Sequence, residues 1–361
     1  SLLTDVKEVQ EKAKKIYYWV QDNIKYVAFE DGMGGFVPRD ANLVCQRRFG
    51  DCKDMSSILV EMLGHAGIDG HLTWIGTRDL PYKYSKIHTP AVDNHMIASY
   101  NYNGKTVFLD AVGSYTPYGF TTAMIQGKEA LVGISEREFQ IHEVPVVKKE
   151  KNVKTDVVQL ELEDGQLEGE GKVTALGYAK LDFVYDLINI NDTKKKEKLV
   201  SLLHKGNNKF LVEEATFEGL SNRDKSLQLL YTFTLGNYAT TYKDELYVNL
   251  HLDKSLRKKD LYLEKRGGVA VKFNYAVLDT FKVSFKIPKG YALHHTPTDE
   301  SFKGEDFGFS VTYKKTKNEI TLETIYYNNL LTMHEPKFKD WNKMMVDLSA
   351  AYQENLVFKK Q

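Results

Sequence analysis

A predicted β-hairpin around Asn103-Gly104 constrains the fold of this chain more than any other feature of its sequence. Residues 95–100 and 106–110, on either side, are rich in β-branched, aromatic and other apolar residues. Asn-Gly is strongly preferred in two-residue hairpin loops, because a type I′ turn needs positive φ at both positions. In the register that this loop imposes, His95 and Asp110 lie on one face as a diagonal pair, with Cα atoms about 7–8 Å apart. A slip of one residue would place them on opposite faces.

An amphipathic helix is predicted directly after Asp51, which is a plausible N-cap residue. Apolar residues recur at helical spacing in Met55, Ile58, Leu59, Met62 and Leu63. Cys52 then lies in the first turn, where unpaired backbone N–H groups and the helix dipole favour a thiolate. The same N–H groups can help to bind an oxyanion.

A cysteine on a helix, followed by a histidine and an aspartate on adjacent strands, is the order in which thiol proteases and transglutaminases carry their catalytic groups. His95 would take the thiol proton from Cys52, and Asp110 would hold the imidazole in the useful tautomer. Each residue also has a structural interpretation. A buried cysteine often serves as a small apolar residue, and the histidine and aspartate could be an ordinary core residue and a strand end. The position of Cys52 at a helix start favours catalysis.

Residues 47–55 (RRFGDCKDM) resemble the nucleophile segment of transglutaminase-like bacterial proteins, whose pattern is aromatic-Gly-Asp-Cys-Lys-Asp. The upstream segment 34–39 (GGFVPR), Asn94-His95 and residues 109–111 (LDA) also match that family. The resemblance extends over roughly residues 6–135.

This resemblance implies a papain-like fold in which Cys52, His95 and Asp110 form a catalytic triad. A second donor to the oxyanion is expected beside the helix N-terminus. Tyr26 and Gln46 are candidates for that donor, although either residue could equally be structural.

Composition argues against several other classes of protein. The 49 basic and 49 acidic residues cancel, so nothing indicates steering toward nucleic acid. No apolar run approaches the roughly 20 residues that a membrane-spanning helix needs. Cys45 and Cys52 are the two cysteines, and no Cys/His spacing indicates a zinc site. No Asp-x-Asp-x-Asp-Gly calcium loop is recognisable, so we expect neither a metal nor a cofactor.

The length of 361 residues suggests two or three domains. The charged run 148–152 (KKEKN) predicts an exposed linker. We therefore expect an α+β chain: a papain-like, transglutaminase-core domain at 1–147, followed by mainly antiparallel β structure. The latter comprises a β-rich accessory domain with short helices at 153–267 and a β-rich segment with a terminal helix at 268–361. These two can also form a single domain.

Two loops of the first domain are candidates for lining a substrate groove. The glycine-rich loop 31–35 lacks the Lys-Ser/Thr that a phosphate-binding loop requires, and it could also be a plain connector. The loop 78–93 is long and contains two prolines and two tyrosines. Loops of this length in compact domains are often functional.

The expected function is cysteine-dependent acyl transfer on a peptide or protein amide through a thioester. Family resemblance leaves peptidase, amidase and protein-crosslinking transglutaminase open, and the accessory β structure makes hydrolysis the preferred outcome. A non-catalytic module that binds protein or glycan is the alternative from a different class. The resemblance also suggests a periplasmic or secreted location and a further β-rich domain preceding this chain.

Overall fold

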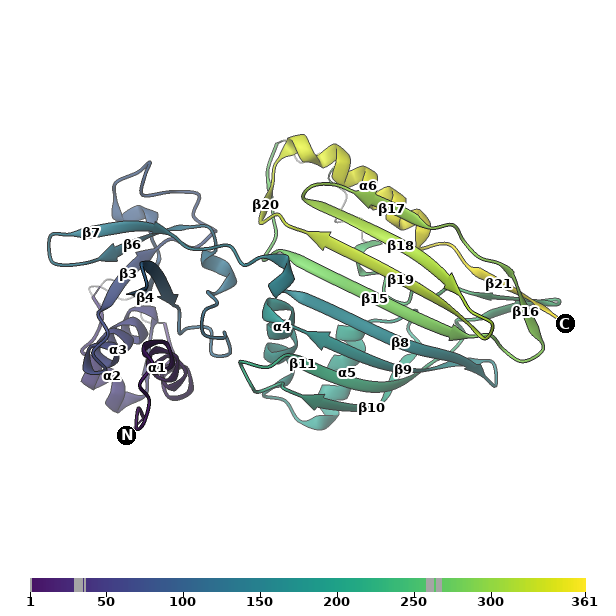
Figure 1. Ribbon diagram of the computed structural model, residues 1–361, viewed down its shortest axis with the longest axis horizontal. Helices are drawn as coiled ribbons and strands as arrows, with labels where there is room; N and C mark the ends of the chain where they lie inside the picture. Colours follow the sequence, from purple (N-terminus) through teal and green to yellow (C-terminus); the bar gives the residue numbers. More distant parts are fainter. Residues whose placement is uncertain (1, 29–34, 36, 258–262, 264–267) are drawn as a thin grey trace. The chain divides into compact units, whose positions relative to one another are not determined.

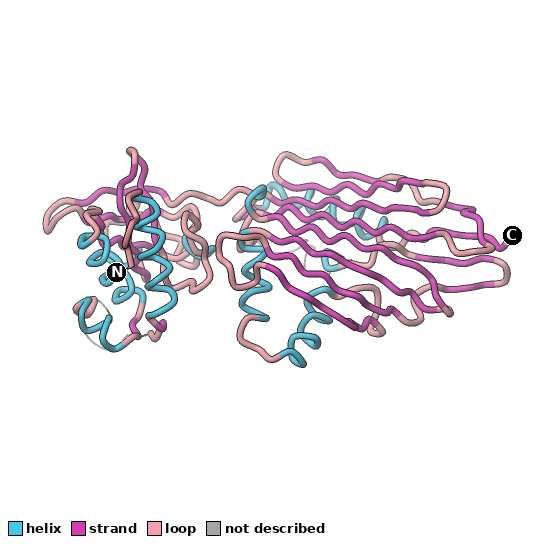
Figure 2. Tube along the Cα trace, turned by 60° about the horizontal axis from the view of Figure 1, so that its bottom comes forward, coloured by secondary structure: helices cyan, strands magenta, loops and turns pink. Residues whose placement is uncertain are grey.

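The computed structural model describes residues 2–28, 35, 37–257, 263 and 268–361. The chain divides into two compact units, Ser1–Val147 and Lys148–Gln361, each with its own hydrophobic core. Figure 1 labels their elements and Figure 2 distinguishes helices from strands. Helices and antiparallel strands are mostly segregated rather than alternating, so the predicted α+β class is confirmed.

The first unit combines helices with a five-stranded antiparallel sheet of order β5-β4-β3-β6-β7. Its helices are α1 (Val9–Asn23), α2 (Ala41–Arg47) and α3 (Cys52–His65). The sheet strands are β3 (Gly70–Ile75), β4 (His95–Tyr102), β5 (Lys105–Leu109), β6 (Glu129–Gly133) and β7 (Phe139–Glu143). A short parallel pair is formed by β1 (Lys25–Tyr26) and β2 (Phe49–Gly50).

The hairpin of β4 and β5 has the register that the sequence predicts. Tyr102 pairs with Lys105, and Ala98 pairs with Leu109. The two loop residues both have positive φ, 51° at Asn103 and 73° at Gly104. A left-handed conformation at both positions is what a type I′ turn requires. The turn therefore fixes which residues of β4 and β5 share a face.

The core of the first unit lies on both faces of this sheet. On one face, α1 and α3 pack against apolar residues of β4 and β5 such as Ala98, Tyr100 and Leu109. On the other face, Ile75 and Ile97 belong to a second, smaller cluster. The predicted apolar stripe of α3 is buried except for Met62, which is half-buried.

The second unit is built on an eight-stranded sheet of order β10-β11-β9-β8-β15-β19-β18-β17. Its strands, in chain order, are β8 (Val153–Glu163), β9 (Gln166–Ala175), β10 (Phe210–Glu218), β11 (Leu227–Leu235), β15 (Val277–Lys286), β17 (Glu300–Lys303), β18 (Phe307–Lys315) and β19 (Glu319–Asn328). A four-stranded sheet contains β12 (Thr240–Tyr242), β13 (Glu245–Val248), β16 (Tyr291–His295) and β21 (Leu356–Lys360). The remaining elements are α4 (Gly177–Leu187), α5 (Asp192–Leu203), α6 (Phe338–Ala351) and the pair β14 (Val271–Lys272) and β20 (Thr332–Met333).

One core spans the whole second unit. Residues from α4, α5, α6 and the four-stranded sheet pack against one face of the large sheet, and Figure 1 shows α4 and α5 behind its long strands. The buried side of α6 contains the predicted residues Trp341, Met344, Met345 and Leu348, together with Phe338 and Ala351. Because β8 lies directly beside β15, in parallel, the segments 153–267 and 268–361 share a single sheet.

A buried polar cluster in this core depends on a glycine. Tyr231 pairs across the strands with Gly171, and its ring covers the position that a Cβ of Gly171 would occupy. The Tyr231 hydroxyl donates a hydrogen bond of 2.8 Å to Asp156, which also pairs with Lys205 at 2.5 Å. Buried charges of this kind are tolerated only when they are paired and hydrogen-bonded.

We expect Gly171→Ala to destabilise the second unit, because the new Cβ would lie 2.0 Å from Cζ of Tyr231. Overpacking of this kind typically costs about 1–3 kcal/mol. Gly236→Ala is the matched control, since its nearest neighbour would be 3.5 Å away. Thermal unfolding followed by circular dichroism provides the measurement. Equal transition temperatures for the two variants would contradict this account of the core.

Candidate active site

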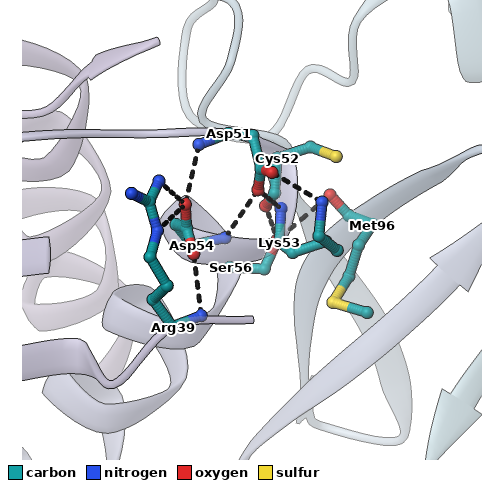
Figure 3. A network of polar contacts seen from close by, with 7 residues as sticks. All are labelled: Arg39, Asp51, Cys52, Lys53, Asp54, Ser56 and Met96. Carbon is teal, nitrogen blue, oxygen red and sulfur yellow. Dashed lines mark hydrogen bonds and ion pairs between the residues drawn. The ribbon is translucent and has the colours of Figure 1, made fainter. Parts of the chain in front are cut away.

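A capping box fixes the start of α3. The carboxylate of Asp51 accepts hydrogen bonds from the backbone N–H groups of Lys53 at 2.9 Å and of Asp54 at 3.2 Å. The Asp54 carboxylate in turn accepts from the backbone N–H of Asp51 at 3.0 Å, as Figure 3 shows. This reciprocal arrangement satisfies helix-end donors. It leaves Cys52 as the first residue of the helix, at the positive end of the helix dipole.

An arginine from the segment before α2, Arg39, stabilises this capping box. The backbone N–H and Nε of Arg39 donate to the Asp54 carboxylate at 2.8 and 2.9 Å, and its Nη2 contacts the same group. Burial raises the pKa of Asp54, but the bonds from Arg39 outweigh it, so the pKa is lowered overall. Gly50 must lack a side chain here, because a Cβ would lie 2.5 Å from Cβ of Asp54. Lys53 in turn pairs with Asp51 at 2.6 Å. Each residue of the Gly-Asp-Cys-Lys-Asp segment thus has a geometric role.

Ser56 connects this helix to the strand that carries the histidine. Its Oγ lies 2.7 Å from the carbonyl oxygen of Cys52 and 3.0 Å from that of Met96. Figure 3 shows these contacts and shows the sulfur of Cys52 pointing away from the Arg39–Asp54 pair. His95, which precedes Met96 at the start of β4, lines the same cavity as Cys52 and is close enough for the thiol to contribute to the raised pKa of His95.

Asp110 lies on the far side of the histidine, as the hairpin register predicts. Nε2 of His95 is 3.2 Å from Oδ1 of Asp110, and the two residues are 8% and 1% exposed. The other carboxylate oxygen accepts a hydrogen bond from Thr122, and the Tyr17 hydroxyl donates to the Asp110 carbonyl at 3.0 Å. Asp110 is therefore held at both its side chain and its backbone.

The surroundings of His95 favour its protonated form. Burial alone would lower the pKa of His95, but the charge of Asp110 and the hydrogen bonds with Asp110 and Cys52 raise it to about 10. With Nε2 directed at Asp110, the other ring nitrogen remains for the thiol. The arrangement can therefore hold a proton between the sulfur and the imidazole.

Cys52 and His95 open into one cavity of about 840 Å³. The residues that line it come from several segments of the first unit: Tyr26, Ala28, Gly35, Asp51, Cys52, Lys53, Trp74, Tyr84, His88, Thr89, Asp93, Asn94, His95, Met96, Leu131, Phe139 and Ile141. A cavity of this size is within the range of sites for small molecules or for a few residues of a peptide.

The structure places the two candidate oxyanion donors differently. Tyr26 pairs with Gly50 in the short parallel sheet, which brings its side chain to the cavity wall next to the start of α3. Gln46 lies exposed on α2 and is not among the residues that line the cavity. Helix α2 therefore does not bring Gln46 to Cys52, and Tyr26 stays the candidate.

The long loop 78–93 lines the cavity as the sequence suggests. The ammonium group of Lys128 donates to the carbonyl oxygens of Leu80 and Tyr82 at 2.6 and 2.9 Å. Tyr84 donates to Asp93 at 2.8 Å. These bonds hold the loop against the sheet. Of the glycine-rich loop, Gly35 lines the cavity, whereas residues 31–34 lie outside the described residues.

Sequence reasoning missed several residues that position the triad. Ser56 carried a usable signal, because it lies one turn after Cys52 at the buried edge of the predicted helix. Arg39 lies in the segment 34–39 that resembles the family, although its contact with Asp54 was not predicted. Thr122 and Tyr17 carried no signal, since their contacts with Asp110 come from other segments of the chain.

Other features of the site concern cysteines and ions. Cys45 and Cys52 are both free thiols. Within the described residues, no set of His, Cys, Asp and Glu side chains has an arrangement that could hold a metal ion. None of the helices that the structure describes is both long and apolar enough to cross a membrane.

Models of known protein families match two segments of the chain, one near each end. Residues 2–98 match the model of the transglutaminase-like superfamily. Residues 244–358 match a family described as a domain of unknown function with a solved structure (DUF3858). A search of curated proteins gave no match.

Solved structures were compared as well. The crystal structure of a candidate protease from Parabacteroides distasonis aligns with 99% of this chain and 53% of its own, at 10% identity and a TM-score of 0.56. This chain thus spans about half the length of that protein and shares its fold. LapG from Legionella pneumophila, treated with EGTA, aligns over 38% of this chain and 76% of its own at 14% identity. Its TM-score of 0.27 is too low to indicate a shared fold. Residues 2–98 are thus similar to the transglutaminase-like superfamily, and the chain as a whole, with its β-rich C-terminal region, shares the fold of the Parabacteroides protein.

Proposed function

We propose that the chain is a cysteine-dependent enzyme that hydrolyses peptide or protein amides through a thioester on Cys52. The observation that carries the proposal is the convergence of a helix-start cysteine and a buried histidine–aspartate pair on one cavity. A lone buried cysteine would need none of these partners. The match to the transglutaminase-like superfamily supports the same reaction class.

The first half of the reaction forms the thioester. In the reactive form, the proton of the Cys52 thiol resides on His95, and the thiolate attacks the carbonyl carbon of the amide. The backbone N–H of Cys52, which the capping box leaves unused, is a candidate donor to the oxyanion, with Tyr26 as a candidate second donor. The carbon–nitrogen bond then breaks, and the leaving amine takes the proton from His95.

The second half releases the acyl group. Water gives a proton to His95 and attacks the thioester carbonyl, the carbon–sulfur bond breaks, and the sulfur recovers the proton. The products are a carboxylic acid and an amine, and the enzyme returns to its starting state. Asp110 orients His95 and stabilises its positive charge throughout. If an amine replaced water as acceptor, the same steps would crosslink rather than hydrolyse.

Capture of the acyl-enzyme tests this proposal directly. The protein is incubated with a peptide library, quenched in acid and digested, and mass spectrometry is used to locate acyl adducts. We expect a thioester on Cys52, and product analysis with and without added amine distinguishes hydrolysis from crosslinking. Absence of any adduct, together with absence of turnover, would favour a binding module.

Cys52→Ala should reduce turnover by at least about 10⁴-fold, because it removes the nucleophile. The fold should persist, with an unfolding temperature within about 2 °C of the wild type, since this partly exposed thiol contributes little packing. Cys45→Ala is the matched control: it removes the other free thiol, which does not line the cavity. Turnover of a captured peptide by Cys52→Ala at the wild-type rate would reject thiol catalysis.

Asp110→Asn should lower kcat/KM by about 10²–10⁴-fold and change its pH dependence. The leaving amine needs a protonated His95, so activity should fall as the pH rises through the raised pKa of His95, about 10. Without the carboxylate, burial lowers that pKa, and the alkaline limb should move down by about 1–3 pH units. Rates measured between about pH 6 and 11 supply the test. An alkaline limb at the same pH in both proteins would show that Asp110 does not control His95.

A further inference from the structure

One wall of the cavity is a row of large apolar side chains that runs from the central strand of the sheet to its β7 edge. Trp74 on β3 pairs with Leu131 on β6, which pairs with Ile141 on β7. Phe139 lies two residues before Ile141, on the same face of β7. These four residues, here called the apolar row, all line the cavity that contains Cys52.

The apolar row contradicts the usual pattern of a half-buried sheet. On β6, the alternate residues Ala130 and Val132 are the ones buried against the protein. The opposite face of an outer strand is normally polar because it meets water. Here Phe139 is 59% exposed and Ile141 is 42% exposed, and neither belongs to a hydrophobic core. Exposed apolar surface of this kind typically marks a binding site.

The surface of the row is also shaped. A Cβ on Gly133 would lie 3.1 Å from Cζ3 of Trp74, so the indole ring extends over Gly133 and lies against the sheet. Gly133 pairs directly with Phe139. The glycine therefore gives the indole ring the room to lie against the sheet.

The row is continuous with the proposed catalytic groups. On its inner side, Trp74 pairs with Met96, the residue next to His95. Among the acidic and basic residues that line the cavity, Asp51 and Lys53 pair with each other at 2.6 Å, and Asp93 accepts a hydrogen bond from Tyr84. A charged side chain would find no compensating charge among Trp74, Leu131, Phe139 and Ile141, whereas an apolar side chain would release water from both surfaces.

We propose that the apolar row is the subsite for a large apolar or aromatic side chain of the substrate, next to the amide that Cys52 attacks. The inference deepens the proposed function and rests on it only in the role given to Cys52. It names the substrate class: peptides or unfolded protein segments with phenylalanine, leucine or a similar residue flanking the reacting amide.

Binding can be tested apart from the chemistry. Cys52→Ala protein is titrated in a calorimeter with three blocked pentapeptides that have phenylalanine, alanine or lysine at the centre and glycine elsewhere. We expect the phenylalanine peptide to bind at least about tenfold more tightly than the other two. In Cys52→Ala protein that also carries Phe139→Ser and Ile141→Thr, this preference should disappear. Both side chains are exposed, so the unfolding temperature should change by less than about 2 °C.

Gln140→Ala is the matched control, because Gln140 lies between the two apolar residues and points to the opposite face of β7. It should leave the preference for phenylalanine unchanged. Equal affinity for all three peptides, or an unchanged preference after the double substitution, would overturn the subsite. A wild-type dimer that dissociates on the same double substitution, seen by light scattering, would also overturn it, because the row would then be an interface. Failure of the proposed function has a different signature: the wild type would bind the peptide selectively without cleaving it.

Discussion

The rest of the site depends on the hydrogen bonds that the carboxylate of Asp54 accepts. It joins the start of α3 to the segment before α2 by accepting hydrogen bonds from Asp51 and Arg39. Its burial costs free energy that only these charge-assisted bonds offset. Because the carboxylate occupies the space beside Gly50, it also determines which residue can precede the cap. The position of the Cys52 sulfur thus follows from a buried ion pair rather than from packing of the thiol itself.

The parts of the fold that were predictable are those with a local physical cause. Asn103-Gly104 determines the hairpin register because positive φ at both residues selects one turn type. The cap at Asp51 and the apolar stripe of α6 are similarly short-range signals. Since His95 and Asp110 belong to the same hairpin, their contact followed from the turn alone.

The parts that were not predictable depend on segments that meet only in the folded chain. Placing β15 in parallel beside β8 requires a crossover of more than a hundred residues, and no local pattern specifies it. No local pattern specifies the hydrogen bond from Thr122 to Asp110 either. Gln46 shows the converse: it is close to Cys52 in sequence, but the path of α2 leaves it exposed. Closeness in sequence is therefore a weak guide to cavity walls, which come from several strands.

The charge on His95 links the reactivity of the site to its stability. The folded state raises the pKa of His95 from 6.5 to about 10, so it binds this proton more tightly than the unfolded chain does. By linkage, the resulting stabilisation is fully present below about pH 6.5 and is lost as the pH rises toward 10. The proton that the leaving amine requires is thus the one that the buried Asp110 carboxylate needs as its counter-charge. A lower pKa at His95 would leave less of the protonated imidazole in neutral and alkaline solution, and it would also reduce this stabilisation of the two strands.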